Sequence, residues 1–145
     1  MSGPALRQVL SHAIIHEAAW RDADDAWRLA QEVRARSHDE AFLRVVEVFL
    51  EVVEIRILTH AEEEETGLYQ EWLESDRGRQ SLIAELVGEH DTLRRLAAAI
   101  EQALTLEHYD DAIFQMGRLL QVSADHARHE EDVLRRVYSV DEVRE

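Results

Sequence analysis

The sequence predicts an all-α fold, an up-down-up-down antiparallel four-helix bundle, and three observations support this prediction. The chain of 145 residues holds one proline and five glycines, so few positions interrupt a helix. Apolar residues recur at helical spacing along four long segments. Short polar connections separate these segments, as is typical of a bundle. A chain of this length is expected to form a single domain over residues 1–145.

Each predicted helix is bounded by residues that favour a turn or a cap. Ser37-His38-Asp39 forms the first connection, where serine or aspartate suits a helix N-terminus. Ser75-Asp76-Arg77-Gly78 forms the second connection, and residues 106–110 form the third. The predicted helices cover residues 5–36, 39–74, 79–106 and 110–138.

The second predicted helix carries polar residues on its apolar face. Counting back from His60 in steps of three and four reaches Ile57, Val53 and Phe49, which form the buried face of an amphipathic helix. Glu64 follows His60 by four residues and therefore shares that face. An unpaired carboxylate in a core is costly, so it needs a partner. A metal ion is a partner that histidine and glutamate can share.

The other three helices also place histidines on their apolar faces. His16 lies about as far before the first turn as His60 lies after it, and Glu64 and His90 lie at similar distances from the second turn. The fourth helix carries a second His-x-x-x-Glu pair, and its histidine lies about as far from the third turn as His90 does. Folded lengthwise, all four helices bring them to one level of the core. The predicted metal-binding residues are His16, His60, Glu64, His90, His126 and Glu130, with His12 one turn before His16 as a seventh.

The chain also contains a weak internal repeat. His60-x-x-x-Glu64-Glu65-x-x-Leu68 matches His126-x-x-x-Glu130-Glu131-x-x-Leu134. The first two helices and the last two are then related hairpins. Each hairpin supplies a histidine from its first helix and a His-x-x-x-Glu pair from its second.

This pattern resembles the hemerythrin family in its broad His-His-Glu cation-binding form. The resemblance covers nearly the whole chain and rests on His16 within Ile15–Asp22, on the two His-x-x-x-Glu-Glu motifs, and on His90 within Glu89–Leu93. It implies a four-helix bundle that holds two non-haem irons joined by an oxide or hydroxide. It also implies that Glu64 and Glu130 bridge the metals, with His16, His60, His90 and His126 as terminal ligands.

The sequence departs from oxygen-carrying hemerythrins in the third helix. Those proteins carry a His-x-x-x-His pair there, whereas His90 stands alone between Leu86 and Arg94. The pair occurs instead on the first helix, as His12 and His16. If His12 binds metal, one coordination position stays open; without His12, two stay open.

The function that the resemblance implies is the binding or activation of dioxygen, or of a related small molecule such as peroxide or nitric oxide. Two alternatives stay open: an enzyme of the oxidase or peroxidase type acting on a small substrate, and an iron or oxygen sensor. A ferritin-like oxidase is disfavoured because no histidine follows a glutamate by three residues. Imidazole and carboxylate ligands alone suit iron, manganese, zinc or cobalt, and the resemblance favours iron over manganese or zinc.

Charge and composition exclude several other classes of function. The net charge of −15 argues against nucleic acid and anionic membranes as partners. The chain has no cysteine, so disulfides and thiolate metal sites are excluded. We find no signal-peptide pattern and no apolar run that could span a bilayer, so a cytoplasmic location is expected.

Several residues near the motifs are expected to play supporting or ordinary roles. His129 is expected to be partly exposed or to support a ligand, and Glu65 could orient one. His38 and His108 lie in predicted turns and should contact solvent. Glu62, Glu63 and Glu65 should lie on a hydrated face of the second helix, unless Glu65 orients a ligand.

Overall fold

The structure is a computed structural model that describes the backbone of residues 3–144 and the side chains of residues 10–138. Every element in this range is helical, and the range contains no strand. The all-α prediction is therefore confirmed, and the architecture is compatible with a four-helix bundle. In chain order the elements are α1 (Gly3–Ala35), α2 (Asp39–Val52), the π-helix η1 (Val53–Leu58), α3 (Thr59–Thr66), α4 (Leu68–Ser75), the short 3₁₀ helix η2 (Arg77–Arg79), α5 (Gln80–Thr105) and α6 (Tyr109–Arg144).

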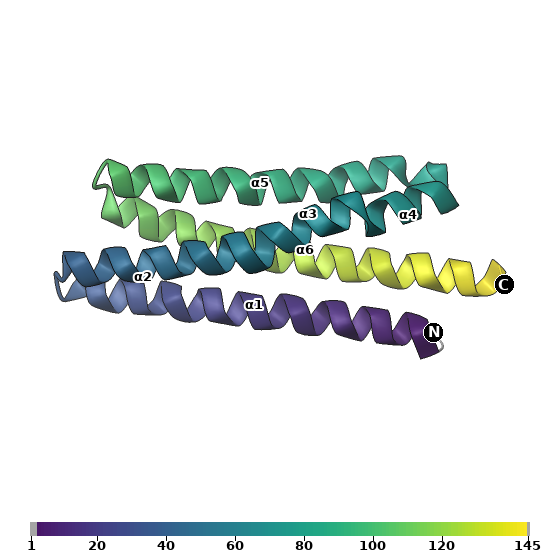
Figure 1. The fold of residues 1–145 in the computed structure, drawn as a ribbon, viewed down its shortest axis with the longest axis horizontal. Helices are drawn as coiled ribbons and strands as arrows, with labels where there is room; N and C mark the ends of the chain where they lie inside the picture. The colour runs from purple at the N-terminus through teal and green to yellow at the C-terminus, as the bar shows by residue number, and fades with distance from the viewer. Residues whose placement is uncertain (1–2, 145) are drawn as a thin grey trace.

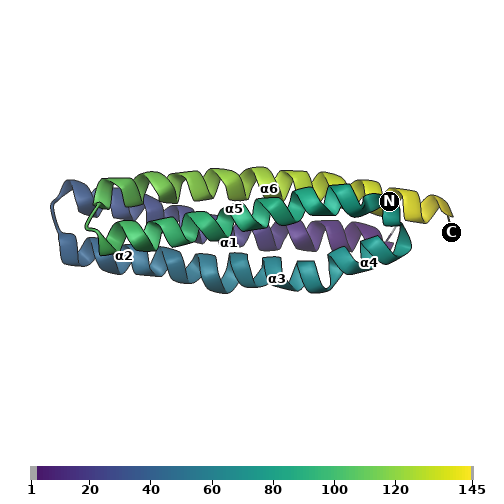
Figure 2. The ribbon, with the colours of Figure 1, turned by 90° about the horizontal axis from the view of Figure 1, so that it is seen from above.

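The elements lie lengthwise beside one another in a long, narrow molecule (Figures 1 and 2). α1 packs against α2 and α6, α5 packs against α6, and η1 contacts both α1 and α5. The connections at residues 36–38 and 106–108 lie at one end of the molecule. The connection at residues 76–79, the start of α1 and the end of α6 lie at the other end. Among the described residues, no helix has an apolar stretch long enough to cross a membrane.

The two connections at the first end have the same backbone geometry. Ser37 and Glu107 both adopt left-handed conformations, with φ of 60° and 59°. In each turn the following amide donates back across the helix end, from His38 to the Val33 carbonyl at 3.4 Å and from His108 to the Ala103 carbonyl at 2.8 Å. This is the pattern that glycine usually provides at a helix C-terminus. The shared geometry is consistent with the two related hairpins that the repeat suggests.

The prediction of one continuous helix over residues 39–74 is wrong in detail. The wider turns of η1 interrupt it first, and the Thr59 hydroxyl donates to the Glu54 carbonyl at 2.9 Å within this region. Gly67 interrupts it again between α3 and α4, with φ of −115° and ψ of −86°. A Cβ atom at Gly67 would lie 3.0 Å from the Glu63 carbonyl oxygen, so this break favours glycine.

The remaining helix boundaries differ from the predictions mainly at the chain ends. α1 begins at Gly3 rather than at residue 5, and α6 continues to Arg144 rather than ending at residue 138. No proline or glycine follows Tyr138 to stop α6. α5 spans Gln80–Thr105, close to the predicted 79–106.

Two apolar clusters fill the interior on either side of a polar layer. The larger cluster fills the half near the turns at 36–38 and 106–108 and draws on α1, α2, η1, α5 and α6. The smaller cluster fills the opposite half and draws on α4, α5 and α6. Its buried members are Tyr69, Trp72, Ile83, Leu86, Val133, Leu134 and Val137.

Two tryptophans fasten α1 to α6 along the larger cluster. The indole N–H of Trp20 donates to the Leu120 carbonyl at 2.9 Å, and that of Trp27 donates to the Ile113 carbonyl at 3.1 Å. Gly117 leaves room for the Trp27 ring, since a Cβ atom there would lie 2.9 Å from its Cζ2 atom. These contacts fix the position of α1, which carries two of the predicted metal-binding residues.

Candidate metal centre

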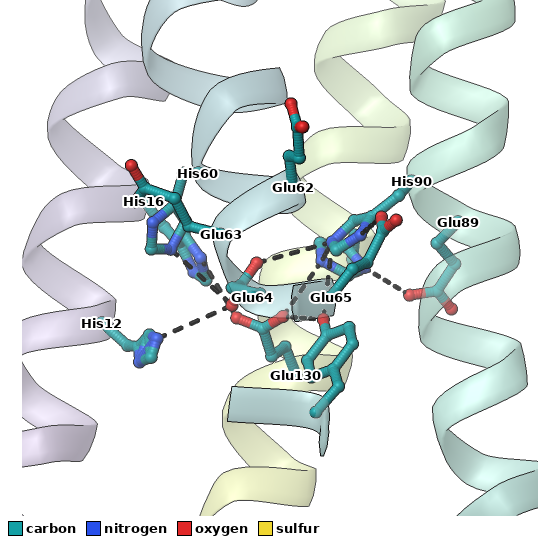
Figure 3. A network of polar contacts seen from close by, with 12 residues as sticks. His12, His16, His60, Glu62, Glu63, Glu64, Glu65, Glu89, His90 and Glu130 are labelled. Carbon is teal, nitrogen blue, oxygen red and sulfur yellow. Dashed lines mark hydrogen bonds and ion pairs between the residues drawn. The ribbon is translucent and has the colours of Figure 1, made fainter. Parts of the chain in front are cut away.

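All seven residues predicted to bind metal meet in the polar layer between the two apolar clusters, and Figure 3 labels all of them except His126. Each long part of the chain contributes to it: α1, α3, α5 and α6 all supply at least one side chain. Five of the seven are buried, and the other two, His16 and His60, are mostly buried. The residues are His12 and His16 from α1, His60 and Glu64 from α3, His90 from α5, and His126 and Glu130 from α6.

Three histidines approach the two carboxylates from the α1 and α3 side. The Nε2 atoms of His12 and His60 each lie 3.6 Å from Glu64 Oε2. The Nε2 atom of His16 lies 3.3 Å from Glu130 Oε1. We call His12, His16 and His60 the first histidine set.

Two histidines approach the same carboxylates from the α5 and α6 side. His90 Nε2 lies 3.5 Å from Glu64 Oε1, and His126 Nε2 lies 3.3 Å from Glu130 Oε2. The two Nε2 atoms are 3.0 Å apart. We call His90 and His126 the second histidine set.

Glu64 and Glu130 therefore each turn one oxygen to the first set and the other oxygen to the second. Two groups of side chains have ligand atoms that lie within 4.8 Å of one another: His12, His60, Glu64 and Glu130 in one, and Glu64, His90, His126 and Glu130 in the other. Both groups share both carboxylates. His16 belongs to neither group, although its Nε2 contacts Glu130. Carboxylates placed in this way could bridge two cations held by the two histidine sets.

Two further carboxylates contact the Nδ1 atoms of the second histidine set, on the side of each ring that faces away from the centre. His90 Nδ1 lies 2.6 Å from Glu65 Oε2, and Arg94 donates to that same oxygen at 2.8 Å. His126 Nδ1 lies 2.6 Å from Glu89 Oε1. A carboxylate accepts hydrogen bonds, so both Nδ1 atoms carry the proton and both Nε2 atoms face the centre. Carboxylates commonly orient metal-binding histidines in this way.

The unsatisfied polar atoms of the layer show that its residues fit a metal ion. His60 Nε2, Glu64 Oε2 and Glu130 Oε1 are buried and have no hydrogen-bond partner among the described residues. Such atoms are costly to bury unless a partner compensates them. The 3.0 Å between His90 and His126 also suits two neighbouring ligands of one ion, because nitrogens about 2.1 Å from a metal at right angles lie about 3.0 Å apart. The layer can therefore hold metal, while these contacts do not select which metal.

The two carboxylates have opposite proton affinities without metal. Burial and the neighbouring Glu130 carboxylate raise the pKa of Glu64 to about 11. Burial also acts to raise the pKa of Glu130, but the neighbouring His126 and His16 rings outweigh burial and hold that pKa well below its usual range. Without metal, the pair therefore keeps one proton on Glu64 at neutral pH.

The histidines also differ in their pKa values, which are lowered for three rings and raised for one. Burial lowers the pKa of His12 to about 4, and it lowers the pKa of His60 and His90 as well. Burial opposes protonation of His126 too, but its hydrogen bonds to Glu130 and Glu89 raise its pKa to about 9. Most of these rings are therefore neutral at pH 7, which is the form that binds metal. The protons on Glu64 and His126 occupy positions that a cation would take.

Tyr69 is the main residue of the site that the sequence analysis missed. Its hydroxyl donates a short hydrogen bond to Glu130 Oε2 and lies 3.4 Å from His90 Nε2. The break at Gly67 turns Tyr69 into the core, where it is fully buried, and leaves Leu68 only partly buried. The repeat had matched Leu68 with Leu134, which is fully buried. The unmatched glycine in the first copy of the repeat was the one signal in the sequence that could have indicated this change.

Glu65 is mostly buried against His90 rather than hydrated, whereas the other supporting and solvated residues lie where the sequence predicts. His129 is partly exposed and supports Glu89, with its Nδ1 atom 2.7 Å from Glu89 Oε2. His38 and His108 lie exposed in the two turns. Glu62 and Glu63 are exposed on α3, and Figure 3 shows both pointing away from the centre. The role of Glu89, which contacts two histidines of α6, was not foreseen.

A narrow cavity of about 30 Å³ borders the centre on one side. Both histidine sets contribute to its wall, through His16 and His60 and through His90 and His126. The rest of the wall is mostly apolar, with Leu93 and Ile57 among its members. A small molecule in this cavity would therefore lie directly against the candidate metal site.

The comparisons with known proteins add no relative. No protein-family model, curated protein or solved structure matches the chain.

Proposed function

We propose that this chain is a hemerythrin-like protein whose core holds two iron ions and binds or activates dioxygen or a related small molecule. In this proposal the long elements form the antiparallel up-down-up-down bundle of that family. The observation that carries the proposal is the pair of ligand groups that share Glu64 and Glu130. Shared carboxylates and separate histidine sets are what a bridged pair of metal ions requires.

The chain's own residues would perform distinct tasks around this centre. Glu64 and Glu130 would bridge, and the two histidine sets would hold one ion each. Two ferrous ions, when bound, would supply electrons for the reduction of a bound small molecule. Glu65 and Glu89 keep the rings of His90 and His126 turned inward through their hydrogen bonds. Tyr69 donates to Glu130 and so fixes the orientation of that carboxylate.

The two histidine sets are unequal, and this inequality supports the placement of a reactive position. The first set has three rings, whereas the second set has two. With two bridging carboxylates and a bridging oxide or hydroxide, an ion held by three histidines would have no free position, and an ion held by His90 and His126 would keep one. The cavity that His90 and His126 line would receive a ligand bound there.

An enzyme of the oxidase or peroxidase type is the second candidate, and the cavity is the observation that favours it. Its wall extends beyond the ligands to Ile57, Leu93 and Ser123, so a small molecule held beside the centre would also contact side chains that do not bind metal. The same metal site serves both candidates, and they differ in whether the bound molecule is released or converted.

The experiment is reconstitution with ferrous iron under anaerobic conditions, followed by elemental analysis and absorption spectroscopy. We expect about two irons per chain. Exposure to air should then produce either a reversible oxygenated band, which indicates binding, or a transient band followed by product, which indicates catalysis. The Glu64→Gln/Glu130→Gln double variant should lose the iron. Glu62→Gln, an exposed position on the same helix, should keep it.

A folded protein that takes up no metal would reject the di-iron proposal. One iron per chain would reject the bridged pair.

A further inference from the structure

The wall of the cavity includes solvent-exposed residues from α1 and from the π-helix η1, and we therefore place its mouth between these two elements. Ile15 and Arg56 are lining residues that also contact solvent: Ile15 is exposed, and the Arg56 side chain is 39% exposed. Arg56 is the lining residue with a permanent positive charge. A molecule that enters here passes Arg56 before it reaches the histidines.

The position of Arg56 follows from the local geometry of the chain. Arg56 lies within the π-helix and precedes His60 by four residues, so both residues border the same cavity. The wide turns of η1 are the kind of irregularity that often accompanies a functional site in a helix. Here they bring a charged side chain to the rim of a mostly apolar cavity.

An ion pair connects the two sides of the mouth. Arg56 donates a short hydrogen bond to the Asp22 carboxylate of α1. Both partners are substantially exposed, at 39% and 55% of their side chains. Ion pairs in contact with water exchange partners readily, because solvent and salt screen them. Asp22 can therefore be replaced by another anion without disturbing buried structure.

The overall charge makes this single cation significant for anionic ligands. The chain carries a net charge of −15, so its field repels anions from the surface. A local positive charge at the mouth raises the concentration of anions there. We propose that Arg56 is the access residue for small monovalent anions, which exchange with Asp22 and then pass to the open metal position. This inference rests on the proposed function and assigns the route by which anions reach that site.

A second groove offers the competing route. It lies between α1 and α6 and shares His16, Ser123 and Ala127 with the wall of the cavity. Arg128 lines this groove, where it pairs with Asp125. Arg128 is therefore a matched control, since it is an exposed, paired arginine beside the other route.

The test measures association rates of azide with the oxidised iron-loaded protein and of nitric oxide with the reduced protein, by stopped-flow absorption. Iron content and helical circular dichroism are measured first for every variant. For Arg56→Gln we expect azide to associate roughly 3- to 10-fold more slowly. Arg56→Lys should restore the rate because it restores the charge. Asp22→Asn should accelerate azide because it frees Arg56. Nitric oxide, which is neutral, should associate at the same rate in all of these variants.

Three outcomes would overturn the access role of Arg56. The first is an unchanged azide rate in both Arg56→Gln and Asp22→Asn with normal iron content. The second is slower azide association in Arg128→Gln instead, which would assign the route to the α1–α6 groove. The third is equal slowing of azide and nitric oxide in Arg56→Gln, which would indicate a change of shape rather than charge. Absence of iron in the unmodified protein would reject the proposed function, and the access role with it.

Discussion

At the scale of single residues, the histidines of the centre differ in whether a hydrogen-bond partner at Nδ1 fixes the orientation of the ring. His90 and His126 each have a carboxylate at Nδ1, from Glu65 and Glu89. The Nδ1 atoms of His12 and His16 have no hydrogen-bond partner among the described residues. The second histidine set is therefore held in place without metal, while the position of the first set would depend more on a bound metal ion.

Glu89 provides a direct test of this support. Glu89→Gln removes the charge that holds His126 and His129 while it keeps the size of the side chain. We expect iron affinity to fall roughly 10- to 100-fold, as is common when a carboxylate behind a metal-binding histidine is changed. Competition with a chelator measures the affinity. Glu85→Gln, at an exposed position 3.9 Å from His129, is the control and should leave it unchanged.

Equal affinity in Glu89→Gln and in the unmodified protein would show that His126 needs no such support.

His12 tests whether the two metal positions are unequal. The ring is buried and its Nε2 lies 3.6 Å from Glu64, so it faces the centre as predicted. His12→Ala should keep both irons but open a second position, which changes azide binding and the rate of autoxidation. His16→Ala should cost metal instead. His108→Ala, in an exposed turn, should behave like the unmodified protein.

If His12→Ala leaves the spectrum, azide binding and autoxidation unchanged, His12 is not a ligand. The centre would then have six protein ligands, and the enzymatic candidate would gain support.

At the scale of elements, the periodicity of apolar residues predicted the helices well but could not reveal their irregularities. A π-helix adds a wider turn without changing the average spacing of apolar residues by much, so η1 left no visible mark on the pattern. The break at Gly67, which places Tyr69 in the core, was likewise not visible in the spacing of apolar residues. Glu89 was missed because its contact with His126 joins two helices, and neither helix shows the pairing in its own sequence. The residues of the candidate metal centre were predictable because histidines and carboxylates stand out on an otherwise apolar helix face.

Each hairpin turn contains a non-glycine residue in the left-handed conformation, and replacing it by glycine should increase the stability of the protein. Glu107 adopts φ of 59° in an exposed position, where a residue with a Cβ atom is strained. Glu107→Gly should raise the free energy of unfolding by about 0.5–1 kcal/mol, measured by urea denaturation. Leu106→Gly is the control, because its φ of −85° is ordinary and glycine there should destabilise the protein. A loss of stability in Glu107→Gly would show that the left-handed turn is not strained.

At the scale of the whole molecule, the metal-free protein must accommodate a polar layer inside an apolar core. It does so with protons, which Glu64 and His126 retain at neutral pH because their pKa values lie near 11 and 9. Metal would displace these protons and satisfy the remaining unpaired atoms, so binding energy becomes folding energy. The stability of the molecule should therefore respond to pH in opposite directions with and without metal.

The expected pH dependence follows from which state binds more protons. Between pH 6.5 and 9 the folded metal-free protein keeps protons on Glu64 and His126 that the unfolded chain releases. Its free energy of unfolding should therefore fall as pH rises, by about 2 kcal/mol per pH unit near pH 8, because each retained proton contributes about 1.4 kcal/mol per pH unit. Below pH 6.5 the lowered pKa values of His12, His60 and His90 reverse the slope, because the unfolded chain then binds more protons. Stability of the metal-free protein should be greatest near pH 6.5.

The iron-loaded protein should melt at a higher temperature than the metal-free protein, and the difference should widen from pH 6.5 to 8. Acid should release the metal, since protons compete for the ligands. Calorimetry of both forms across this range is the measurement. Identical melting curves for the two forms would contradict a stabilising metal.

The separation of the interior into two apolar clusters has a consequence for folding cooperativity. The larger cluster joins α1, α2, η1, α5 and α6, whereas the smaller one, among the described side chains, joins α4, α5 and α6. A polar layer lies between them, so few apolar contacts transmit stability from one half to the other. Without metal, the half that contains α4 should open as a separate unit, with faster amide hydrogen exchange than the half that contains α2. With metal, residues from α1, α3, α5 and α6 are joined at the boundary, and both halves should exchange together in a single global transition.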